Sequence, residues 1–490
     1  MDISNFKDQH ILVIGDIILE RYWSGHSSRI SPEAPVPVVH YKKTEFKLAG
    51  TANLVANLRG LGAKVSFISL GVHIDSDSLE NYHQCLNELD KLSLIHLELL
   101  PYLDDISEHI RIFASDHQML NIDNSKKRYL NNTQKKIFIK KVKEVLEKDQ
   151  TIDKIIISDY GLGAVFETTE LIALAKQYKK ISLIDPYINT NISSKFNSSN
   201  LAYINKCQDA DYLILNNQQM NLLKLEQEDI MDYIANNILS SALLVTSGKK
   251  GMKLIFNAKY KDVGTLEQIA LENELSDISG VGDVVCASFA LCAKNNVNYN
   301  DILKFTNAAC GSAVRKIGIS LVDIVESQLA YADLYYNYEY NFLRKIQEIK
   351  AKQLENKKIV FTNGCFDVFH IGHLTYLKKA KDAGDILVLA VNSDESIKKL
   401  KGDLRPVNNL QARMDVLQEL EFVDYVLPFY EDTPCNFIEY FKPDVLVKGT
   451  DYKESEIIGA DIVKKYGGQI AIIAHEYNDI SSSKIIEKIN

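Results

Sequence analysis

The sequence predicts an α/β protein of two domains in series, each built around a mainly parallel sheet. Its 490 residues exceed the ~250–300 residues at which a single hydrophobic core stops growing. Short apolar runs alternate with helical patterns in both halves, which is typical of parallel sheets with crossover helices. Residues 329–356 interrupt this pattern with a tyrosine-rich and then charged segment that lacks glycine and proline.

The composition excludes several classes of protein. Hydrophobic residues make up 46% and charged residues 25%, as in an ordinary soluble protein. The net charge of −9 argues against a general nucleic-acid binder. Apolar runs are far shorter than the ~18 residues of a membrane helix, and the N-terminus has no signal-peptide pattern. From the charge and the apolar runs we expect no nucleic-acid or membrane partner. Because the seven cysteines include no CxxC pair, we expect a cytoplasmic protein without a disulfide framework or zinc site.

The first domain is expected to span residues 1–328. It begins with HILVIGDI at 10–17, an apolar run ending in Gly-Asp that is typical of a buried parallel strand. Helical patterns separate several similar runs, so right-handed crossovers are expected. The further runs are VSFISLG (65–71), KIIISDYG (154–161), SLIDP (182–186), YLILNN (212–217) and ALLVTSGKKG (242–251).

Residues 329–356 are expected to form a helical linker; the alternative is a terminal helix of either domain. The second domain is expected at 357–490, where alternation resumes and predicts five strands in ~135 residues, a compact nucleotide-binding type of sheet. Its strand runs are KIVFTNG, DILVLAVNSD, VDYVLPF, DVLVKGTDY and QIAIIAHEY.

Two histidines mark a candidate phosphate site in the second domain. His370 and His373 lie at the N-terminal edge of a predicted helix, where free backbone N–H groups and the helix dipole attract anions. Gly372 between them allows a ligand close to the backbone. We therefore expect the pair to donate hydrogen bonds to a polyphosphate; the alternative is that both satisfy loop carbonyls.

The surrounding stretch, GCFDVFHIGHLTYLKKAKDAGDILVLAVNSD, resembles the HxGH signature of nucleotidyltransferases, in particular the cytidylyltransferase-type subgroup. Later segments follow in that family's order, so the resemblance covers 358–490. These segments are KGDLRPV (401–407), ARMDVLQELEFVDYV (412–426), VLVKGTDY (445–452) and ISSSKII (480–486). The resemblance implies transfer of a nucleoside monophosphate from a nucleoside triphosphate to a sugar phosphate, with release of pyrophosphate.

A sugar phosphate is already an anion, so this chemistry needs positive charge and hydrogen-bond donors more than a strong base. The resemblance implies that His370 and His373 are catalytic. The residues expected to bind the nucleotide are Phe366, Lys378, Arg413, Lys448 and Ser482. Lys378 could instead belong to a solvated helix face, Arg413 could be a surface residue, and Asp367 is left without a role.

HIGH is also the signature of class I aminoacyl-tRNA synthetases, and SSSK could mimic their second motif. No anticodon-binding region follows, the segment is short and the chain is acidic, so this interpretation is disfavoured.

A second candidate site lies in DISGVGD at 277–283. Gly280 and Gly282 permit a tight turn whose N–H groups form an anion site at a helix start. Asp283 follows at once and could take a proton from a hydroxyl group, which is a poor nucleophile at neutral pH. This combination predicts phosphoryl transfer from ATP to an alcohol; the alternative is a helix-capping aspartate after a glycine turn.

This stretch resembles the closing DTxGAGD signature of the ribokinase-like (PfkB) carbohydrate kinases, with Val281 in place of the usual alanine. LLVTSGKKGMKL (243–254) and LAGTANLVANLRGLGAKVSFISLG (48–71) resemble the family's ATP-proximal and sugar-binding motifs, although Ala49 replaces a usual glycine. The resemblance implies ATP and Mg²⁺, but Met220 stands where a glutamate usually helps to order the metal. The residues expected to bind ATP are Asn217, Gly248, Gly280, Val281 and Gly282. The residues expected to bind the sugar are Asp16, Gly50 and Asn53.

One further stretch narrows the substrate. GDIILERYWSGHSSRISPEAPVPVV (15–39) resembles the N-terminal pattern of the heptose 7-phosphate kinases, with Glu20 in place of an aspartate. Arg29 and Arg111 could clamp the phosphate already present on the substrate, because arginine suits bidentate phosphate contacts. Either could equally be a surface arginine.

Together the halves resemble the bifunctional heptose 7-phosphate kinase / heptose 1-phosphate adenylyltransferase family. The resemblance implies a ribokinase-like αβα sandwich joined to a Rossmann-like nucleotidyltransferase domain, a homodimer, small sugar-phosphate substrates, and a separate heptose bisphosphate phosphatase. Two alternatives remain open: another sugar kinase fused to a cytidylyltransferase-like domain, and a non-catalytic scaffold.

Overall fold

The computed structural model describes residues 3–72, 80–91, 95–103, 105–114, 117–188, 198–223, 230–260, 265–270, 280–293, 298–314, 321–336, 339–450, 456–474 and 480–489. The chain divides into two compact units: Phe6–Val322, and Asp323–Asn490 together with the first five residues. Both are α/β, as predicted. No helix in the described ranges is long and apolar enough to cross a membrane.

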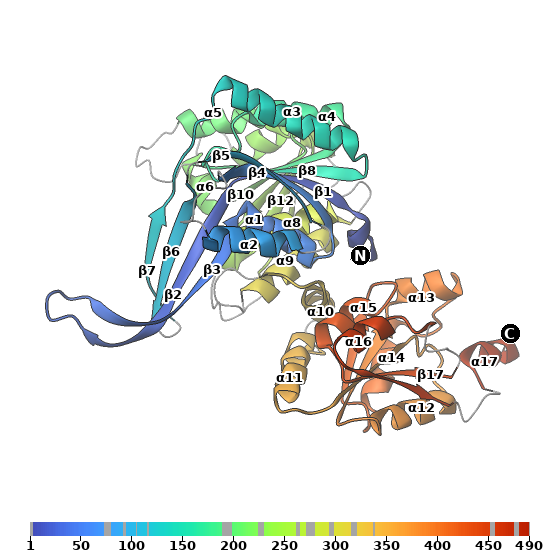
Figure 1. The fold of residues 1–490 in the computed structure, drawn as a ribbon. Helices are drawn as coiled ribbons and strands as arrows, with labels where there is room; N and C mark the ends of the chain where they lie inside the picture. Colours follow the sequence, from blue (N-terminus) through green and yellow to red (C-terminus); the bar gives the residue numbers. More distant parts are fainter. Residues whose placement is uncertain are drawn as a thin grey trace. The chain divides into compact units, whose positions relative to one another are not determined.

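The first unit is built on a nine-stranded sheet (Figure 1). Its strand order is β13-β12-β11-β10-β9-β8-β1-β4-β5, and β12 and β13 are the two antiparallel additions to a parallel sheet. The six predicted strand runs are all present, as β1, β4, β8, β9, β10 and β11. The bounds are β1 (His10–Gly15), β4 (Lys64–Val72), β5 (Ile95–Leu103), β8 (Ile152–Ser158), β9 (Ile181–Asp185), β10 (Tyr212–Asn216), β11 (Ala242–Thr246), β12 (Met252–Phe256) and β13 (Thr265–Gln268).

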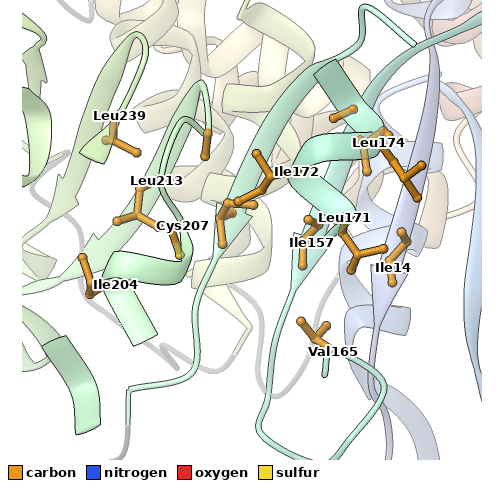
Figure 2. Packing of buried hydrophobic residues seen from close by; sticks show 14 of the residues in the cluster. Ile14, Ile157, Val165, Leu171, Ile172, Leu174, Ile204, Cys207, Leu213 and Leu239 are labelled. Carbon is orange, nitrogen blue, oxygen red and sulfur yellow. The ribbon is translucent and has the colours of Figure 1, made fainter. Parts of the chain in front are cut away.

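Helices cover both faces of this sheet, with α3 and α4 on one side and α1, α2, α8 and α9 on the other (Figure 1). Leu171 and Leu174 of α4 pack over Ile14 of β1 and Ile157 of β8, which illustrates how branched strand residues meet the apolar stripe of a helix (Figure 2). The helices are α1 (Thr51–Gly60), α2 (Glu80–Lys91), α3 (Asn132–Lys148), α4 (Thr168–Gln177), α5 (Ser198–Lys206), α6 (Asn217–Leu222), α7 (Ile230–Tyr233), α8 (Val281–Cys292) and α9 (Tyr299–Ala313).

A second, four-stranded sheet was not predicted. Its order is β3-β2-β6-β7, and the β2–β3 hairpin projects from the main sheet (Figure 1). The strands are β2 (Ile17–Ile30), β3 (Pro37–Gly50), β6 (Ser107–Ala114) and β7 (His117–Asn124). The distal half of β2 and all of β7 are exposed, so these strands carry no continuous apolar run in the sequence. The change from β1 to β2 takes place at Asp16, beside the candidate sugar site.

The second unit contains a five-stranded parallel sheet in the order β16-β15-β14-β17-β18, with all five predicted strands present. The strands are β14 (Ile359–Gly364), β15 (Ile386–Asn392), β16 (Tyr425–Phe429), β17 (Val445–Gly449) and β18 (Gln469–Ile473). The strand order reverses between β14 and β17, and ligands bind at such a switch point, beyond the carboxyl ends of the strands. Its helices are α10 (Ile324–Tyr335), α11 (Phe342–Leu354), α12 (Ile371–Lys381), α13 (Asp394–Lys401), α14 (Leu410–Gln418), α15 (Cys435–Phe441), α16 (Ala460–Lys465) and α17 (Ser482–Ile489).

The segment predicted as a linker forms α10 and α11, which pack within the second unit. Helix α10 contacts α11, α15 and β16. The Asp333 carboxylate accepts hydrogen bonds from the backbone N–H groups of Phe342 and Leu343, at 2.6 and 3.0 Å, and so fixes the turn between the helices. The two compact units meet in the sequence at Val322/Asp323, so α10 and α11 both belong to the second unit.

Candidate active sites

In the first unit, Asp283 lies in the first turn of α8, directly after Gly280 and Gly282. Gly280 has φ +76°, and a Cβ there would lie 2.7 Å from the Asn53 side-chain nitrogen, so only glycine fits without strain. The turn exposes backbone N–H groups at a helix start, as predicted. Residues 277–279 of the motif lie outside the described residues.

The Asp283 carboxylate is buried, with 5% exposure, and is held on both sides. Asn53 Nδ2 donates to Oδ2 at 2.7 Å, and the Tyr160 hydroxyl donates to Oδ1 at 2.7 Å. Burial raises the pKa of Asp283 to about 6, although both hydrogen bonds lower it. Such a carboxylate is ionised at neutral pH and close to the basicity suited to a general base.

The predicted sugar-binding residues meet at the carboxyl end of β1. The Asp16 carboxylate accepts hydrogen bonds from the backbone N–H groups of Tyr160, Leu162 and Ala164, at 3.2, 3.2 and 2.8 Å. Gly50 has φ +62°, and a Cβ there would lie 2.8 Å from the Asp16 carbonyl oxygen. Asp16 therefore orders the 160–164 loop, and Gly50 lets the start of α1 approach β1.

In the second unit, a cavity of about 660 Å³ opens at the switch point of the sheet. It is lined by Asn363, Gly364, Cys365, Phe366, His370, Gly372, His373, Tyr376, Asn392, Leu400, Lys401, Asp432, Pro434, Lys448, Gly449, Glu456, Ile457, Ile458, Ile480, Ser481 and Ser482. Five of the seven residues predicted for this site thus lie together, although the first and the last of them, Phe366 and Ser482, are more than a hundred positions apart in the sequence.

The two histidines stack at the start of α12. His370 caps the helix, because its Nδ1 accepts a hydrogen bond from the Gly372 N–H at 3.2 Å. The ring centroids of His370 and His373 are 3.9 Å apart, and Phe366 and Phe369 flank His373 at 5.2 and 5.7 Å. The packing fixes both imidazoles at the helix start, where the helix dipole suits the binding of phosphate oxygens.

Lys448 and Ser482 complete this side of the cavity. Lys448 Nζ, at the end of β17, donates to Asn363 Oδ1 at 2.5 Å, and burial lowers the pKa of Lys448 to about 8. Ser482 Oγ, at the start of α17, donates to the Val368 carbonyl at 3.0 Å. A cation and a second helix start therefore lie near the histidines.

The chain resembles known proteins over its full length. Residues 361–488 match the cytidylyltransferase-like family. The chain is 34% identical over 490 residues to the bifunctional protein HldE of Marinomonas sp., covering 99% of this chain and 98% of that protein. It is 36% identical over 502 residues to the bifunctional protein HldE of Hydrogenovibrio crunogenus, covering 100% and 98%. The chain belongs to the HldE family. It is a bifunctional, ATP-using enzyme with the heptose kinase and adenylyltransferase activities of ADP-heptose biosynthesis.

The fold of the first unit is that of the ribokinase-like kinases. A crystal structure of phosphofructokinase-2 from Escherichia coli in complex with potassium matches with a TM-score of 0.51 at 14% identity, over 67% of this chain and 99% of that one. The structure of the same protein in complex with substrates and products gives a TM-score of 0.50 at 16% identity, with the same coverage. This likeness shows the fold and confirms the predicted αβα sandwich.

Two residues predicted for the HldE nucleotidyltransferase site are not brought to its cavity. Lys378 is exposed on α12, away from the lining residues, because its helical position places it on the solvated face. Arg413 is 2% exposed, and its guanidinium donates to the carbonyls of Asn408 and Cys365 and to Asp394 Oδ1, at 3.0, 2.7 and 2.7 Å. Arg413 thus braces the loop behind the histidines.

Asp367, which had no predicted role, ties a second segment to the same loop. Its carboxylate accepts hydrogen bonds from Arg405 Nε and from the backbone N–H groups of Val407 and Asn408, at 2.5, 2.8 and 3.0 Å. The KGDLRPV motif is therefore held against the histidine loop through Asp367.

The two arginines predicted to clamp the substrate phosphate in the kinase half lie elsewhere. Arg29 is exposed toward the distal end of β2. Arg111 makes a bidentate pair with the buried Glu20, with Nε–Oε2 and Nη2–Oε1 distances of 3.0 and 2.8 Å. Burial by itself would raise the pKa of Glu20, but hydrogen bonds from His109, Arg111 and Tyr22 hold it at about 2. Arg111 is therefore committed to a buried ion pair.

The residues predicted to bind ATP lie on turns. Asn217 is exposed at the start of α6, and Gly248 lies with φ +55° in the turn after β11. Among the described residues, no atom lies within 4 Å of a Cβ added at Gly248 or Gly282. Met220 packs into the core at 4% exposure, so no carboxylate stands there. Among the described residues, no group of three His, Cys, Asp or Glu side chains is arranged to hold a metal ion.

Several further side chains of the two candidate sites were not predicted from the sequence. The Tyr160 hydroxyl donates to Asp283, and Asp185 ends β9 nearby. The pKa of Asp185 is raised to about 8, mainly by burial and to a smaller extent by the charges of Asp283 and Asp159. Lys126 and Arg128 line a small cavity of about 20 Å³ with Asp16. Asn363, Asn392 and Lys401 line the nucleotidyltransferase cavity. The sequence signal that could have identified some of them is their position, because the polar residues 159, 160 and 185 directly follow or end predicted parallel strands.

Proposed function

We propose that the first unit transfers the γ-phosphate of ATP to the C1 hydroxyl of heptose 7-phosphate. The second unit then transfers AMP from ATP to heptose 1-phosphate and releases pyrophosphate. The observation that carries this assignment is that different side chains stand at the starts of α8 and α12. The start of α8 holds a buried carboxylate with a pKa near 6, whereas the start of α12 holds two stacked imidazoles.

In the kinase reaction, Asp283 would accept the proton of the sugar hydroxyl as its oxygen attacks the γ-phosphorus. The backbone N–H groups of Gly280, Val281 and Gly282 at the start of α8 would stabilise the charge on the transferring phosphoryl group. Asn217 and Gly248 lie on turns that would approach the rest of ATP. Asp16, Gly50 and Asn53 would shape the sugar side, Asp16 by ordering the loop above it.

The phosphate already present on the sugar needs a cation that is not committed elsewhere. Lys126 and Arg128 follow β7 and line the same cavity as Asp16. Arg128 Nε is buried without a hydrogen-bond partner among the described residues. Lys126 is already ion-paired with Asp105. We therefore propose that Arg128 binds this phosphate in place of the predicted Arg29 and Arg111, because guanidinium groups bind phosphate oxygens in a fork.

In the adenylyl transfer, the attacking phosphate needs no base. His370, His373 and Lys448 would neutralise charge on the α-phosphate and the leaving pyrophosphate, and Ser482 would add a hydroxyl donor at the start of α17. Phe366 would bound the nucleotide side of the cavity. Lys378 and Arg413, by their positions, would act on this reaction only indirectly.

Mg²⁺ is proposed to enter with ATP, because Mg²⁺ commonly binds substrate phosphates and water with few protein ligands. The described residues of this chain do not themselves form a three-ligand metal site, so no step is assigned to the ion. A separate phosphatase must remove the 7-phosphate between the two reactions. We also propose a cytoplasmic homodimer; exposed apolar side chains on the four-stranded sheet, such as Tyr41 and Leu120 at 64% and 53% exposure, support an interface there.

The test is a product assay on the full chain with heptose 7-phosphate and ATP. We expect heptose 1,7-bisphosphate from the wild type, and a loss of about 10²–10⁴-fold in Asp283→Asn, because general bases contribute this much. Adenylyl transfer to heptose 1-phosphate should be unchanged in the same variant. Full kinase activity in Asp283→Asn would refute the assignment. CTP in place of ATP tests the cytidylyltransferase alternative, which predicts turnover with CTP.

A further inference from the structure

The Asp283 carboxylate is surrounded by two neutral donors, one on each oxygen. Asn53 donates from α1, and Tyr160 donates from the loop after β8, both at 2.7 Å. A carboxylate oxygen can accept more than one hydrogen bond, so a substrate hydroxyl can still approach. Hydrogen bonds from neutral donors favour the charged form and fix the plane of the carboxylate.

Tyr160 is itself held at several points. Its backbone N–H donates to Asp16 Oδ2 at 3.2 Å, and the next N–H, of Gly161, donates to Asp159 Oδ1 at 2.7 Å. Gly161 has φ +74°, and a Cβ there would lie 2.7 Å from the Tyr187 ring. The loop is therefore closely packed, and the position from which the Tyr160 side chain reaches Asp283 is fixed.

Asn53, the donor to the other carboxylate oxygen of Asp283, is itself fixed by Asn57. Asn57 Nδ2 donates to the Asn53 backbone carbonyl at 2.9 Å and to Asn53 Oδ1 at 3.2 Å. Asn57 Oδ1 in turn accepts the Val322 N–H at 2.8 Å. The Asn53 side-chain carbonyl is thus directed to Asn57, which leaves its NH₂ group for Asp283. Asn53, predicted to bind the sugar, has the same relation to Asp283 as Tyr160.

We propose that Tyr160 is a positioning residue of the kinase reaction, which keeps the Asp283 carboxylate ionised and oriented to accept the proton of the sugar hydroxyl. The inference rests on the proposed role of Asp283 as base. In the step, the sugar O–H bond breaks and its proton goes to Asp283, while the sugar oxygen bonds to the γ-phosphorus. The bond from the γ-phosphorus to the β,γ-bridging oxygen breaks, and ADP leaves. Tyr160 keeps its own proton throughout.

Other ionisable groups face Asp283 from each neighbouring element. Glu20 of β2 repels its charge but is paired with Arg111. Burial, and then the nearby Asp283 and Asp159, raise the pKa of Asp185 of β9 to about 8, which favours its neutral form near pH 7. Burial raises the pKa values of Cys286 on α8 and of Tyr160 well above their ordinary ranges, so both keep their protons. Tyr160 and Asn53 are therefore the donors that offset burial of Asp283.

The test is the pH dependence of the heptose kinase reaction in Tyr160→Phe, measured on the full chain with adenylyl transfer assayed in the same sample. We expect kcat to fall about tenfold at pH 7 with KM changed by less than about twofold, because orientation of the base is lost while binding is kept. The acid limb of kcat/KM should move upward by about one pH unit, because a hydrogen bond to the charged form is gone. Adenylyl transfer should be unchanged.

Tyr203→Phe is the matched control, because the Tyr203 hydroxyl also donates to a buried aspartate, Asp159, at 2.7 Å. Its acid limb should match that of the wild type. In an Asp283→Asn background, Tyr160→Phe should cause no further loss, because Tyr160 acts through Asp283. An unmoved acid limb in Tyr160→Phe, or the same fold loss with and without Asp283, would overturn the inference. Full activity of Asp283→Asn alone would instead overturn the role of Asp283.

Discussion

In the proposed reactions, both units bind ATP at the same type of structural feature, a helix start, but the side chains around the two helix starts differ. At α8 the key side chain is a buried carboxylate with a neutral donor on each oxygen. At α12 it is a pair of stacked imidazoles, with the half-buried Lys448 lining the same cavity. The nucleophile explains the difference: a hydroxyl must lose a proton, whereas a phosphate is already ionised and must be brought close to another anion.

The starts of the two helices are also built differently. Gly280 precedes α8 with φ +76° and has no side-chain cap, so its first N–H groups remain available. The start of α12 is capped by the catalytic candidate His370 itself, through Gly372. One site thus relies on backbone donors next to a base, and the other on side chains that also stabilise the helix.

The largest difference between the effects on the two activities is expected from His373→Ala. Adenylyl transfer should fall by about 10²–10³-fold, the usual loss when one donor to a transition-state charge is removed. The heptose kinase rate should stay within about twofold, because α12 belongs to the other unit. Rates of pyrophosphate and ADP release, measured on one preparation, check both expectations. A kinase rate that falls with the adenylyltransferase rate would contradict the division of labour.

A smaller effect should distinguish the arginines of the kinase half. Arg128→Gln is expected to raise KM for heptose 7-phosphate by about tenfold or more, because a charge-assisted hydrogen bond is lost. Arg29→Gln is the matched control and should leave KM unchanged, because Arg29 is exposed toward the distal end of β2. Initial rates at varied heptose 7-phosphate measure both values. If Arg29→Gln raised KM and Arg128→Gln did not, the sequence-based prediction would be restored.

The sequence predicted the fold well wherever strands are buried on both faces, as in β1, β4 and β8, because their apolar runs are continuous. It did not predict β2, β3, β6 and β7, since one-sided exposed strands have no such run. The linker at 329–356 was predicted as helical, but its packing against β16 depends on contacts distant in sequence.

The candidate sites show the same limit. Motif positions predicted that Asp283, His370 and His373 lie at helix starts, because glycine turns and helix starts are local features. Arg111 and Arg413 are basic residues in motif-like segments, yet their partners, Glu20 and Asp394, are set by tertiary structure. The strand-end position of Tyr160 is a local signal, but its partner Asp283 lies 123 positions away, and no local sequence pattern predicts that contact.

The pH dependences of the two activities are expected to differ, with kcat/KM lost at low pH in one unit and at high pH in the other. The pKa of Asp283 is raised to about 6 and the base must be deprotonated, so kinase kcat/KM should fall as pH drops below about 6. Burial lowers the pKa of Lys448 to about 8 and its charged form is needed, so adenylyltransferase kcat/KM should fall as pH rises above about 8. Both rates measured from pH 5 to pH 10 test this. A shared limb would mean that one ionisation controls both units.

The smallest effect separates two lysines of the second unit. Lys378→Ala should change adenylyltransferase kcat/KM by less than about twofold, because an exposed lysine outside the cavity is largely screened by water. Lys448→Ala is the contrasting variant and should lose at least about tenfold, because the half-buried Lys448 lines the cavity and its ammonium donates to Asn363. Equal losses in both variants would mean that α12 turns its outer face toward the nucleotide during the reaction. A loss in Lys448→Ala alone would place the positive charge of this site at the end of β17.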